Sequence, residues 1–354
     1  MAKRGTIVVA VPGLQGGVDE ATRHLFGDRS VTDHWGVTTL VTRGRRPVLA
    51  PVVLVGALAR LVGWHRRGRV ELLHLNVSSR GSAYRKLAVA RVARTIGLPY
   101  VIQLHGGGFE RFHADLGSRT RRIIDRFFAE AAHVFVLGEP FRRLVEDQVG
   151  VPAERVSVLR NAVSVPPDER ADERPEPPMI LFTGRLGPGK GTPELVEALG
   201  RLAGLSWTAV LVGDGAVEET SAQVAALGLD DRIEVRGWQS RTVVSDLLDT
   251  ASIFVLPSHL EALSVSLLEA MAAGLCCVAT PVGAHPEIMT DGVDGLLVEP
   301  GDVAALEKAL TLALTDAVLR LRLGREARST VEARCSTPVV ADRLSTVYDR
   351  VLAR

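Results

Sequence analysis

Two pairs of charged residues could bind a ligand: a cationic pair suits a diphosphate, and a pair of glutamates suits sugar hydroxyls. Arg185 and Lys190 stand in the glycine-rich segment 184–191, which follows a short apolar run. Such a loop before a helix suits a phosphate, because backbone N–H groups and cations bind its oxygens together. Glu261 and Glu269 flank a predicted helix start. Glu269, about one turn into that helix, is placed to accept hydrogen bonds from a ribose diol.

The segment 184–190 nearly matches the P-loop pattern G-x-x-x-x-G-K-[ST]. A P-loop requires a hydroxyl after the lysine to hold magnesium, and Gly191 occupies that position, so an NTPase is rejected. Thr192 is expected to be the N-cap of the next helix, with Pro193 at its first helical position. The alternative to a diphosphate clamp is a glycine-rich connector with solvated charges.

Two turns in the first half of the chain are further candidates. His105 precedes three glycines and follows a predicted strand, so it is expected to face a ligand as a hydrogen-bond partner or proton carrier. A structural histidine is the alternative. Gly16 and Gly17 form a phosphate-approach turn, but the spacing is not G-x-G-x-x-G. Residues 34–44 also lack the acid that would bind a ribose, so a nicotinamide enzyme is not expected.

Turns in the second half complete the candidate site. Gly213 ends one predicted strand, and Gly237 with Trp238 follows the next, where this pair can lie against a nucleobase. The segment 263–266 is predicted to open a helix, whose free N–H groups and positive dipole end suit a phosphate or a sugar hydroxyl.

No metal site is expected. The chain has no D-x-D triplet, and the H-x-E segments 259–261 and 285–287 lack the P-C-x-x-C partner of a deaminase, because Cys276 and Cys277 are adjacent. Three cysteines form neither a disulfide framework nor a metal-ligand spacing, which fits a reducing cytoplasm.

Short β-branched runs alternate with helical patterns along the chain, which predicts βαβ units and the α/β fold class, with two Rossmann-like doubly wound parallel sheets. The expected strands are 6–11, 37–42, 70–75, 99–104, 132–137, 155–159, 179–183, 208–212, 232–236, 252–256, 276–279 and 295–298. The expected helices include 83–96, 192–203, 216–227, 264–273 and 302–322.

The proline-rich stretch 166–178 is predicted to link two domains, 1–165 and 179–335, while 336–354 forms a C-terminal helix with the option of packing back on the first domain. Ligands bind beyond the carboxyl ends of such sheets, so the site is expected in a cleft between the domains. Residues 1–165 carry 25 Lys and Arg against 13 Asp and Glu, and the remainder carries 17 against 28. This charge split suggests different partners for the two halves.

Hydrophobic residues make up 46% and charged residues 23% of the chain, which excludes disordered and collagen-like classes. No run approaches the roughly 18 apolar residues of a membrane span. The apolar run 6–11 is broken by Pro12 and is interpreted as a first strand rather than a signal peptide.

Taken together, these motifs resemble the retaining glycosyltransferases of the GT-B fold, close to glycosyltransferase family four, the group 1 type. The matching segments of the second half are FTGRLGPGKG (182–191), LVGDG (211–215), VRGW (235–238), LPSHLEALSVSLLEAMAAG (256–274) and TPVGAHPEIMTDGVDGLLVEPGD (280–302). Looser matches are GLQGG (13–17), QLHGGGFE (103–110) and VLRNAVSV (158–165). The segment NVSSRGSAYRK (76–86) is similar to enzymes that extend polysaccharides on lipid carriers.

The resemblance implies roles for these residues. Arg185 and Lys190 would neutralise the departing diphosphate, Glu269 would hold the ribose, and Glu261 would lie beside the donor sugar. The implied catalytic residues are His105, Arg185, Lys190 and Glu261; the implied donor-binding residues are Gly16, Gly17, Gly184, Gly213, Gly237, Trp238, Leu263, Ser264, Val265 and Glu269. Two departures from the family pattern, Ala262 and Ala162 in place of glycine, affect loop conformation.

The implied reaction moves a sugar, with retention of configuration, from a nucleotide-diphosphate-sugar to a saccharide or polyprenyl-diphosphate-linked acceptor, in polysaccharide or glycolipid biosynthesis. No cofactor, metal or nucleic acid is expected. A non-catalytic nucleotide-sugar-binding subunit and a GT-B phosphorylase remain as alternatives.

An arginine-rich stretch predicts contact of a cytoplasmic enzyme with the anionic inner face of the plasma membrane. Its members are Arg60, Arg66, Arg67, Arg69, Arg80, Arg85, Lys86, Arg91 and Arg94. Solvated arginines that reflect genome composition are the alternative reading.

Overall fold

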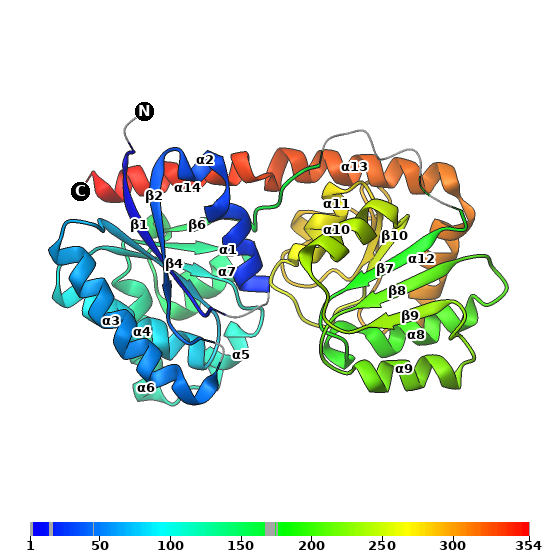
Figure 1. Ribbon diagram of the computed structural model, residues 1–354, viewed down its shortest axis with the longest axis horizontal. Helices are drawn as coiled ribbons and strands as arrows, with labels where there is room; N and C mark the ends of the chain where they lie inside the picture. Colours follow the sequence, from blue (N-terminus) through cyan, green and yellow to red (C-terminus); the bar gives the residue numbers. More distant parts are fainter. Residues whose placement is uncertain (1–2, 14–16, 45, 167–173, 175, 354) are drawn as a thin grey trace. The chain divides into compact units, whose positions relative to one another are not determined.

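The computed structural model describes residues 3–13, 17–44, 46–166, 174 and 176–353. The chain divides into two compact units. The first, here called the N-terminal unit, comprises Met1–Ala162 with Thr337–Arg354, and the second, the C-terminal unit, comprises Val163–Ser336. Each unit is a six-stranded sheet with helices on both faces (Figure 1).

The N-terminal unit has the strand order β2-β1-β3-β4-β5-β6, all parallel. Its strands are β1 (Gly5–Val11), β2 (Trp35–Val41), β3 (Leu72–Val77), β4 (Tyr100–Leu104), β5 (His133–Val136) and β6 (Val156–Val158). Its helices are α1 (Gly17–Gly27), α2 (Arg29–Thr32), α3 (Ala50–Arg66), α4 (Gly81–Thr95), α5 (Phe109–Ala114), α6 (Ser118–Ala129), α7 (Glu139–Arg143) and α14 (Thr337–Leu352), with the π-helix η2 (Leu144–Val149) and the 3-10 turns η1 (Pro47–Leu49) and η3 (Ala153–Arg155). The chain reverses its direction of strand addition between β1 and β3.

The C-terminal unit repeats this architecture with the order β12-β11-β10-β7-β8-β9. Its strands are β7 (Met179–Thr183), β8 (Thr208–Val212), β9 (Ile233–Arg236), β10 (Ile253–Leu256), β11 (Cys276–Ala279) and β12 (Leu296–Leu297). Its helices are α8 (Thr192–Arg201), α9 (Val217–Ala226), α10 (Arg241–Thr250), α11 (Val265–Ala272), α12 (Val303–Thr315) and α13 (Ala317–Cys335), with the short turns η5 (Pro188–Lys190) and η6 (His285–Glu287). Here the reversal lies between β7 and β10.

The predicted fold class is confirmed. Each predicted strand is present, with ends displaced by two residues at most. The strands read as continuous apolar runs because helices cover both faces of a parallel sheet, so both sets of side chains are buried. All six residues of β3 and all four of β10 are buried.

One predicted helix is wrong, and part of the predicted linker lies outside the described residues. The single helix predicted over 302–322 is wrong: the Asp316 side chain accepts a hydrogen bond from the Leu319 N–H at 2.9 Å and starts a separate helix, α13. Residues 167–173 and 175 of the expected linker lie outside the described part of the chain.

The C-terminal helix α14 belongs to the N-terminal unit. Trp35 Nε1 donates to Ser345 Oγ at 2.9 Å, and the Tyr348 hydroxyl lies 2.7 Å from His74 Nδ1. Trp35, His74 and Tyr348 are fully buried, so these hydrogen bonds fix the helix in the core of that unit. In the described ranges, no helix has the length and apolarity needed to cross a membrane.

Candidate functional site

The candidate site of the C-terminal unit lies where its strand order reverses. In open parallel sheets, ligands bind outside the carboxyl ends of the strands at this switch point. The two turns that leave it follow β7 and β10, and each carries a predicted charged residue. Lys190 ends η5 after β7, and Glu261 lies between β10 and α11.

Lys190 Nζ and Glu261 Oε1 form an ion pair across these two turns. Ser258 Oγ donates to the same carboxylate oxygen at 3.0 Å. The Glu261 side chain is 11% exposed and that of Lys190 is 28% exposed, so the pair is shielded yet reachable from solvent. These contacts hold the Glu261 carboxylate and the Lys190 ammonium in fixed positions.

Backbone contacts force the two turns together. Gly191 has φ +69°, and a Cβ there would lie 2.1 Å from the carbonyl oxygen of Pro257. The His259 N–H donates to the Gly189 carbonyl at 3.2 Å. Glycine is therefore required at position 191 both for its dihedral angle and for the close approach.

The expectation that Thr192 caps α8 is wrong. The N-cap is Gly191, which has no side-chain capping bond, and Thr192 is the first helical residue. The buried Thr192 Oγ1 instead accepts a hydrogen bond from the Gly187 N–H at 2.7 Å. This hydrogen bond closes the glycine-rich loop between Gly187 and Thr192.

The turn after β8 lies against the turn after β7. A Cβ on Gly213 would lie 1.7 Å from the Gly184 carbonyl oxygen, and a Cβ on Gly215 would lie 2.3 Å from that of Leu186. The Leu186 N–H donates to Asp214 O at 2.7 Å. These contacts fix the backbone beside Arg185, whose exposed side chain runs along Gly215 with Cγ near that glycine.

The first turn of α11 is positioned by a buried histidine. Ser264 is the N-cap, and its hydroxyl accepts from the Leu267 N–H at 3.4 Å. The Ser264 N–H donates to His285 Nε2 at 3.3 Å, and His285 Nδ1 lies 3.0 Å from the Thr280 carbonyl. Burial lowers the pKa of His285, so the ring is neutral, donates from Nδ1 and accepts at Nε2. The N–H groups of Val265 and the next residue are left for a ligand by helix geometry.

The remaining predicted residues of this unit fall around these turns. Leu263 is buried before the N-cap, while Glu269 is partly buried in the second turn of α11. Gly237 follows β9, and Trp238 beside it is 54% exposed, which leaves its ring open to stacking. Gly184 ends β7 with φ +159°.

In the N-terminal unit, His105 follows β4 and is partly buried. Its Nε2 lies 2.8 Å from Asn76 Oδ1 at the end of β3, and Asn76 Nδ2 donates to Thr22 Oγ1 at 2.9 Å. Burial lowers the pKa of His105 to about 3, and His74 adds to this effect while Asn161 opposes it. The ring is therefore neutral at physiological pH, with its Nε2–H directed at Asn76.

Two further predicted residues belong to the turn after β1. Gly17 is the first residue of α1, whereas Gly16 lies outside the described residues. The prediction that Lys86 belongs to the membrane-facing set is wrong. Lys86 is fully buried, and its ammonium donates to Thr42 Oγ1 at 2.9 Å. Arg94 pairs with Glu130, which neutralises another of the set.

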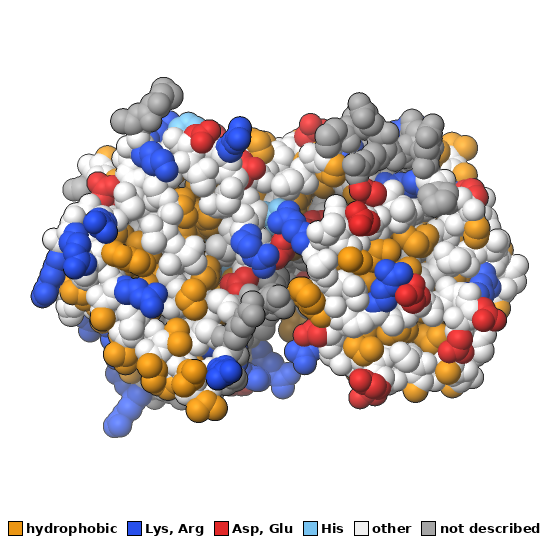
Figure 2. Space-filling model, in the orientation of Figure 1, with side chains coloured by type: hydrophobic (Ala, Val, Ile, Leu, Met, Phe, Trp, Pro, Cys, Tyr) orange, Lys and Arg blue, Asp and Glu red, His pale blue; other side chains and the backbone are white. Residues whose placement is uncertain are grey.

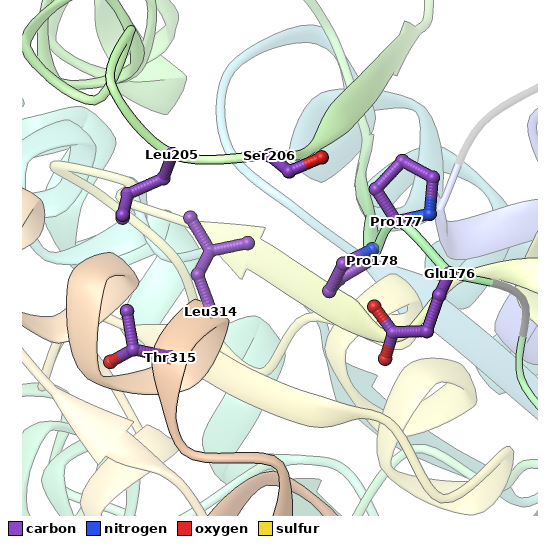
Figure 3. A pocket seen from close by; sticks show the side chains of 7 residues that line it. All are labelled: Glu176, Pro177, Pro178, Leu205, Ser206, Leu314 and Thr315. Atoms are coloured by element: carbon purple, nitrogen blue, oxygen red, sulfur yellow. The ribbon is translucent and has the colours of Figure 1, made fainter.

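A surface hollow of about 500 Å³ lies elsewhere on the C-terminal unit (Figure 3). Its lining residues are Glu176, Pro177, Pro178, Leu205, Ser206, Leu314 and Thr315. Pro178 and Ser206 precede β7 and β8, so the hollow is at the amino ends of the strands, opposite the turns described above. It contains none of the predicted site residues.

Three positioning residues were missed in the sequence: Ser258, His285 and Asn76. His285 and Asn76 act through contacts between turns that are distant in the chain, so no local spacing signals them. Ser258 lies only three residues before Glu261, and Asn76 follows a predicted strand as His105 does, so these two positions carry a signal in the sequence.

Two family models match the chain. The model described as a glycosyl transferase 4-like domain matches residues 4–162, and the model described as glycosyl transferases group 1 matches residues 167–330. The two matches fall on the two sheets in turn.

Relatives and solved structures agree with this match. An alpha-D-kanosaminyltransferase of Streptomyces kanamyceticus is 28% identical over 73% of this chain and 72% of its own length. A 2-deoxystreptamine N-acetyl-D-glucosaminyltransferase of Streptomyces fradiae is 28% identical over 82% of this chain and 76% of its own. The sucrose-phosphate synthase of Thermosynechococcus elongatus superposes with a TM-score of 0.80 at 20% identity, covering 99% of this chain and 100% of that one. HepE of Anabaena, solved with UDP-glucose, gives 0.77 at 18% identity, covering 98% and 100%.

Proposed function

This chain belongs to the group 1 glycosyltransferases, and we propose that it transfers a sugar from a nucleoside diphosphate sugar to the hydroxyl group of an acceptor. The observation that carries the proposal is the Lys190–Glu261 ion pair at the switch point of the C-terminal sheet. Arg185 and the N-terminus of α11 leave the same edge of that sheet. Their chemistry matches a diphosphate better than any other common ligand group.

In the proposed reaction, the bond between the anomeric carbon and the diphosphate oxygen breaks. Negative charge then grows on the leaving nucleoside diphosphate, where Lys190 and Arg185 stabilise it. Glu261 holds the Lys190 ammonium in place before the donor binds. The acceptor oxygen forms the new bond to the anomeric carbon, and its proton passes to the departing diphosphate.

Two cations and a helix N-terminus supply the charge stabilisation that a divalent ion gives in other enzymes, so we propose a reaction without metal or other cofactor. Retention of configuration is proposed from the family. Glu269, in the second turn of α11, is proposed to accept hydrogen bonds from the ribose hydroxyls, and Trp238 to lie against the base. The neutral ring of His105 is proposed to hydrogen-bond the donor sugar.

The acceptor is proposed to be a saccharide or a lipid-linked saccharide of a polysaccharide or glycolipid pathway. Support comes from the N-terminal unit, where exposed arginines stand on its surface (Figure 2). Such a surface suits an anionic acceptor or an anionic membrane. A cytoplasmic enzyme at the inner face of the plasma membrane is the corresponding proposal for its location.

Thermal-shift screening of UDP-, GDP- and dTDP-sugars tests the proposal. A ligand at 100 times its Kd adds about 2.7 kcal/mol of stability, which is enough to rank donors. The nucleotide sugar that raises the Tm is then used as the donor in an activity assay. The assay measures the release of nucleoside diphosphate and the anomeric configuration of the product. The proposal fails when no nucleotide sugar raises the Tm, or when a bound donor is never turned over with any acceptor or water.

A further inference from the structure

A second cluster of cations surrounds the switch point of the N-terminal sheet. Arg43 lies in the turn after β2, and Arg85 and Lys86 lie in the second turn of α4, the helix that follows β3. These elements leave the carboxyl edge of the sheet beside the point where the strand order reverses, between β1 and β3. Open α/β sheets bind ligands at such a point.

Lys86 lies beneath the cluster. It is fully buried, and it donates to Thr42 Oγ1, which in turn donates to the Val11 carbonyl at 2.9 Å. Burial lowers the pKa of Lys86 to about 7, Arg85 lowers it further, and Asp19 opposes both effects. A buried lysine under this repulsion is stabilised by an additional anion.

Arg85 is short of partners. Its Nε is buried and makes no hydrogen bond within the described part of the chain. Its Nη1 lies 3.1 Å from the position that a Cβ on Gly81 would occupy, so the guanidinium lies back along the first turn of α4. Burial lowers the pKa of Arg85, and the positive charge of the nearby Arg43 lowers it further. Like charges held together, beside a helix N-terminus, favour binding of a polyanion.

The turn that carries Arg43 also packs on an apolar helix. A Cβ on Gly44 would lie 3.4 Å from Val53 Cγ2 of α3. The outward side of η1 and α3 bears four exposed hydrophobic residues, with exposed fractions from 46% to 89%. They are Val48, Leu49, Val52 and Val55. Figure 2 shows hydrophobic side chains gathered over the region where α3 runs in Figure 1.

The members of this apolar face follow helical spacing, and the stretch of chain that carries them, residues 34–70, contains no Asp or Glu. An apolar stripe beside cations is complementary to an amphiphile with an anionic head. A nucleic acid would engage the cations but would leave the valines exposed.

We propose that this part of the N-terminal unit binds a lipid diphosphate, with Arg43 and Arg85 on the diphosphate and the valine face of α3 along the hydrocarbon chain. Lys86 acts from below through its charge. The inference rests on the proposed function, because it names the chemical class of the acceptor: a saccharide carried on a lipid diphosphate.

Farnesyl diphosphate and inorganic diphosphate serve as probes, measured by titration calorimetry on the full chain. The double variant Arg43→Gln and Arg85→Gln is expected to lower the affinity for farnesyl diphosphate at least tenfold, because two charge-assisted contacts are lost. The double variant Val52→Asn and Val55→Asn is expected to lower the affinity for farnesyl diphosphate but not for inorganic diphosphate. Arg29→Gln, an exposed arginine on α2 of the same unit, and Val318→Asn, an exposed valine of the C-terminal unit, are matched controls that change the binding of neither probe.

Titration of UDP and of the active donor separates this inference from the proposed function. Arg185→Gln with Lys190→Gln should weaken the nucleotide and leave the valine-dependent part of farnesyl diphosphate binding intact. The inference is overturned when farnesyl diphosphate does not bind, when only the Arg185 and Lys190 variant weakens it, or when the two valine substitutions have no effect. If the wild-type protein binds no nucleotide, the proposed function is overturned but the binding of a lipid diphosphate is not.

Discussion

Lys190 and Glu261, which are 71 positions apart in the chain, form an ion pair between the turns that follow two neighbouring strands, β7 and β10. The pair stands at the point where the C-terminal sheet changes its direction of growth. Lys190 ends the single 3-10 turn η5 and Glu261 lies in a loop, so the position of the pair depends on the backbone of both turns. The close contact of Gly191 with Pro257 supplies that constraint.

Replacing Lys190 by alanine is expected to lower turnover of the donor by a factor of about 10² to 10³, because a fixed cation that stabilises the leaving group is lost. Initial rates of nucleoside diphosphate release measure the effect. Lys308→Ala is the matched control, since Lys308 is exposed on α12 of the same unit. An unchanged kcat in Lys190→Ala, with the donor still bound, would contradict the assigned role.

Gly213→Ala is expected to destabilise the C-terminal unit by several kcal/mol and to abolish donor binding. The added Cβ would lie 1.7 Å from the Gly184 carbonyl oxygen, so the two glycine-rich turns must separate. Gly189→Ala is the control in the same region, because nothing lies within 4 Å of its Cβ position. Urea unfolding compares the two variants, and equal stability of both would show that the contact is not tight in solution.

Much of this architecture is predictable from local pattern. Apolar β-branched runs locate the strands because a doubly covered parallel sheet buries both faces of each strand. Glycine-rich segments locate the turns at the carboxyl edge of the sheet, because those turns need dihedral angles that glycine adopts most easily. The cations within such a segment are Arg185 and Lys190. The pairing of Lys190 with Glu261 does not follow from spacing, because it depends on which strands become neighbours.

Two errors and one omission share a physical cause. Thr192 was expected to cap a helix, yet its hydroxyl accepts a hydrogen bond within the loop. Lys86 was grouped with surface arginines, yet the packing of α4 on the sheet buries it beside Thr42. His285 stands in an H-x-E segment that is rejected as a metal motif from the sequence, and its contact with the first turn of α11 has no local signal. In each case the partner is distant in the chain, and tertiary contact overrides the local pattern.

Acid should destabilise the N-terminal unit through His74. Burial lowers the pKa of His74 to about 4, so between pH 4 and 6.5 the unfolded chain binds a proton that the folded chain does not. Stability therefore falls as pH decreases through this window, by about 2 kcal/mol between pH 7 and pH 5. His74→Gln should flatten the pH dependence of urea unfolding by that amount, whereas His34→Gln, at an exposed position, should not. An identical pH slope in His74→Gln and wild type would refute this assignment.

Binding of an anion at the N-terminal cluster should depend on pH through Lys86. Its pKa of about 7 is lowered by burial and by Arg85 and is raised by Asp19, and Lys86 in turn lowers the pKa of His105. A bound diphosphate favours the ammonium form, so affinity is greatest below pH 7 and falls as pH rises through the pKa of the free protein. A rise of about one unit in this pKa on binding corresponds to about a tenfold loss of affinity by pH 9.

Inorganic diphosphate also titrates in this pH range. The decisive quantity is therefore the difference between wild type and Lys86→Met in how the affinity for inorganic diphosphate changes with pH. Lys86→Met should bind more weakly at pH 6 and show the smaller slope; parallel slopes would mean that Lys86 does not sense the anion.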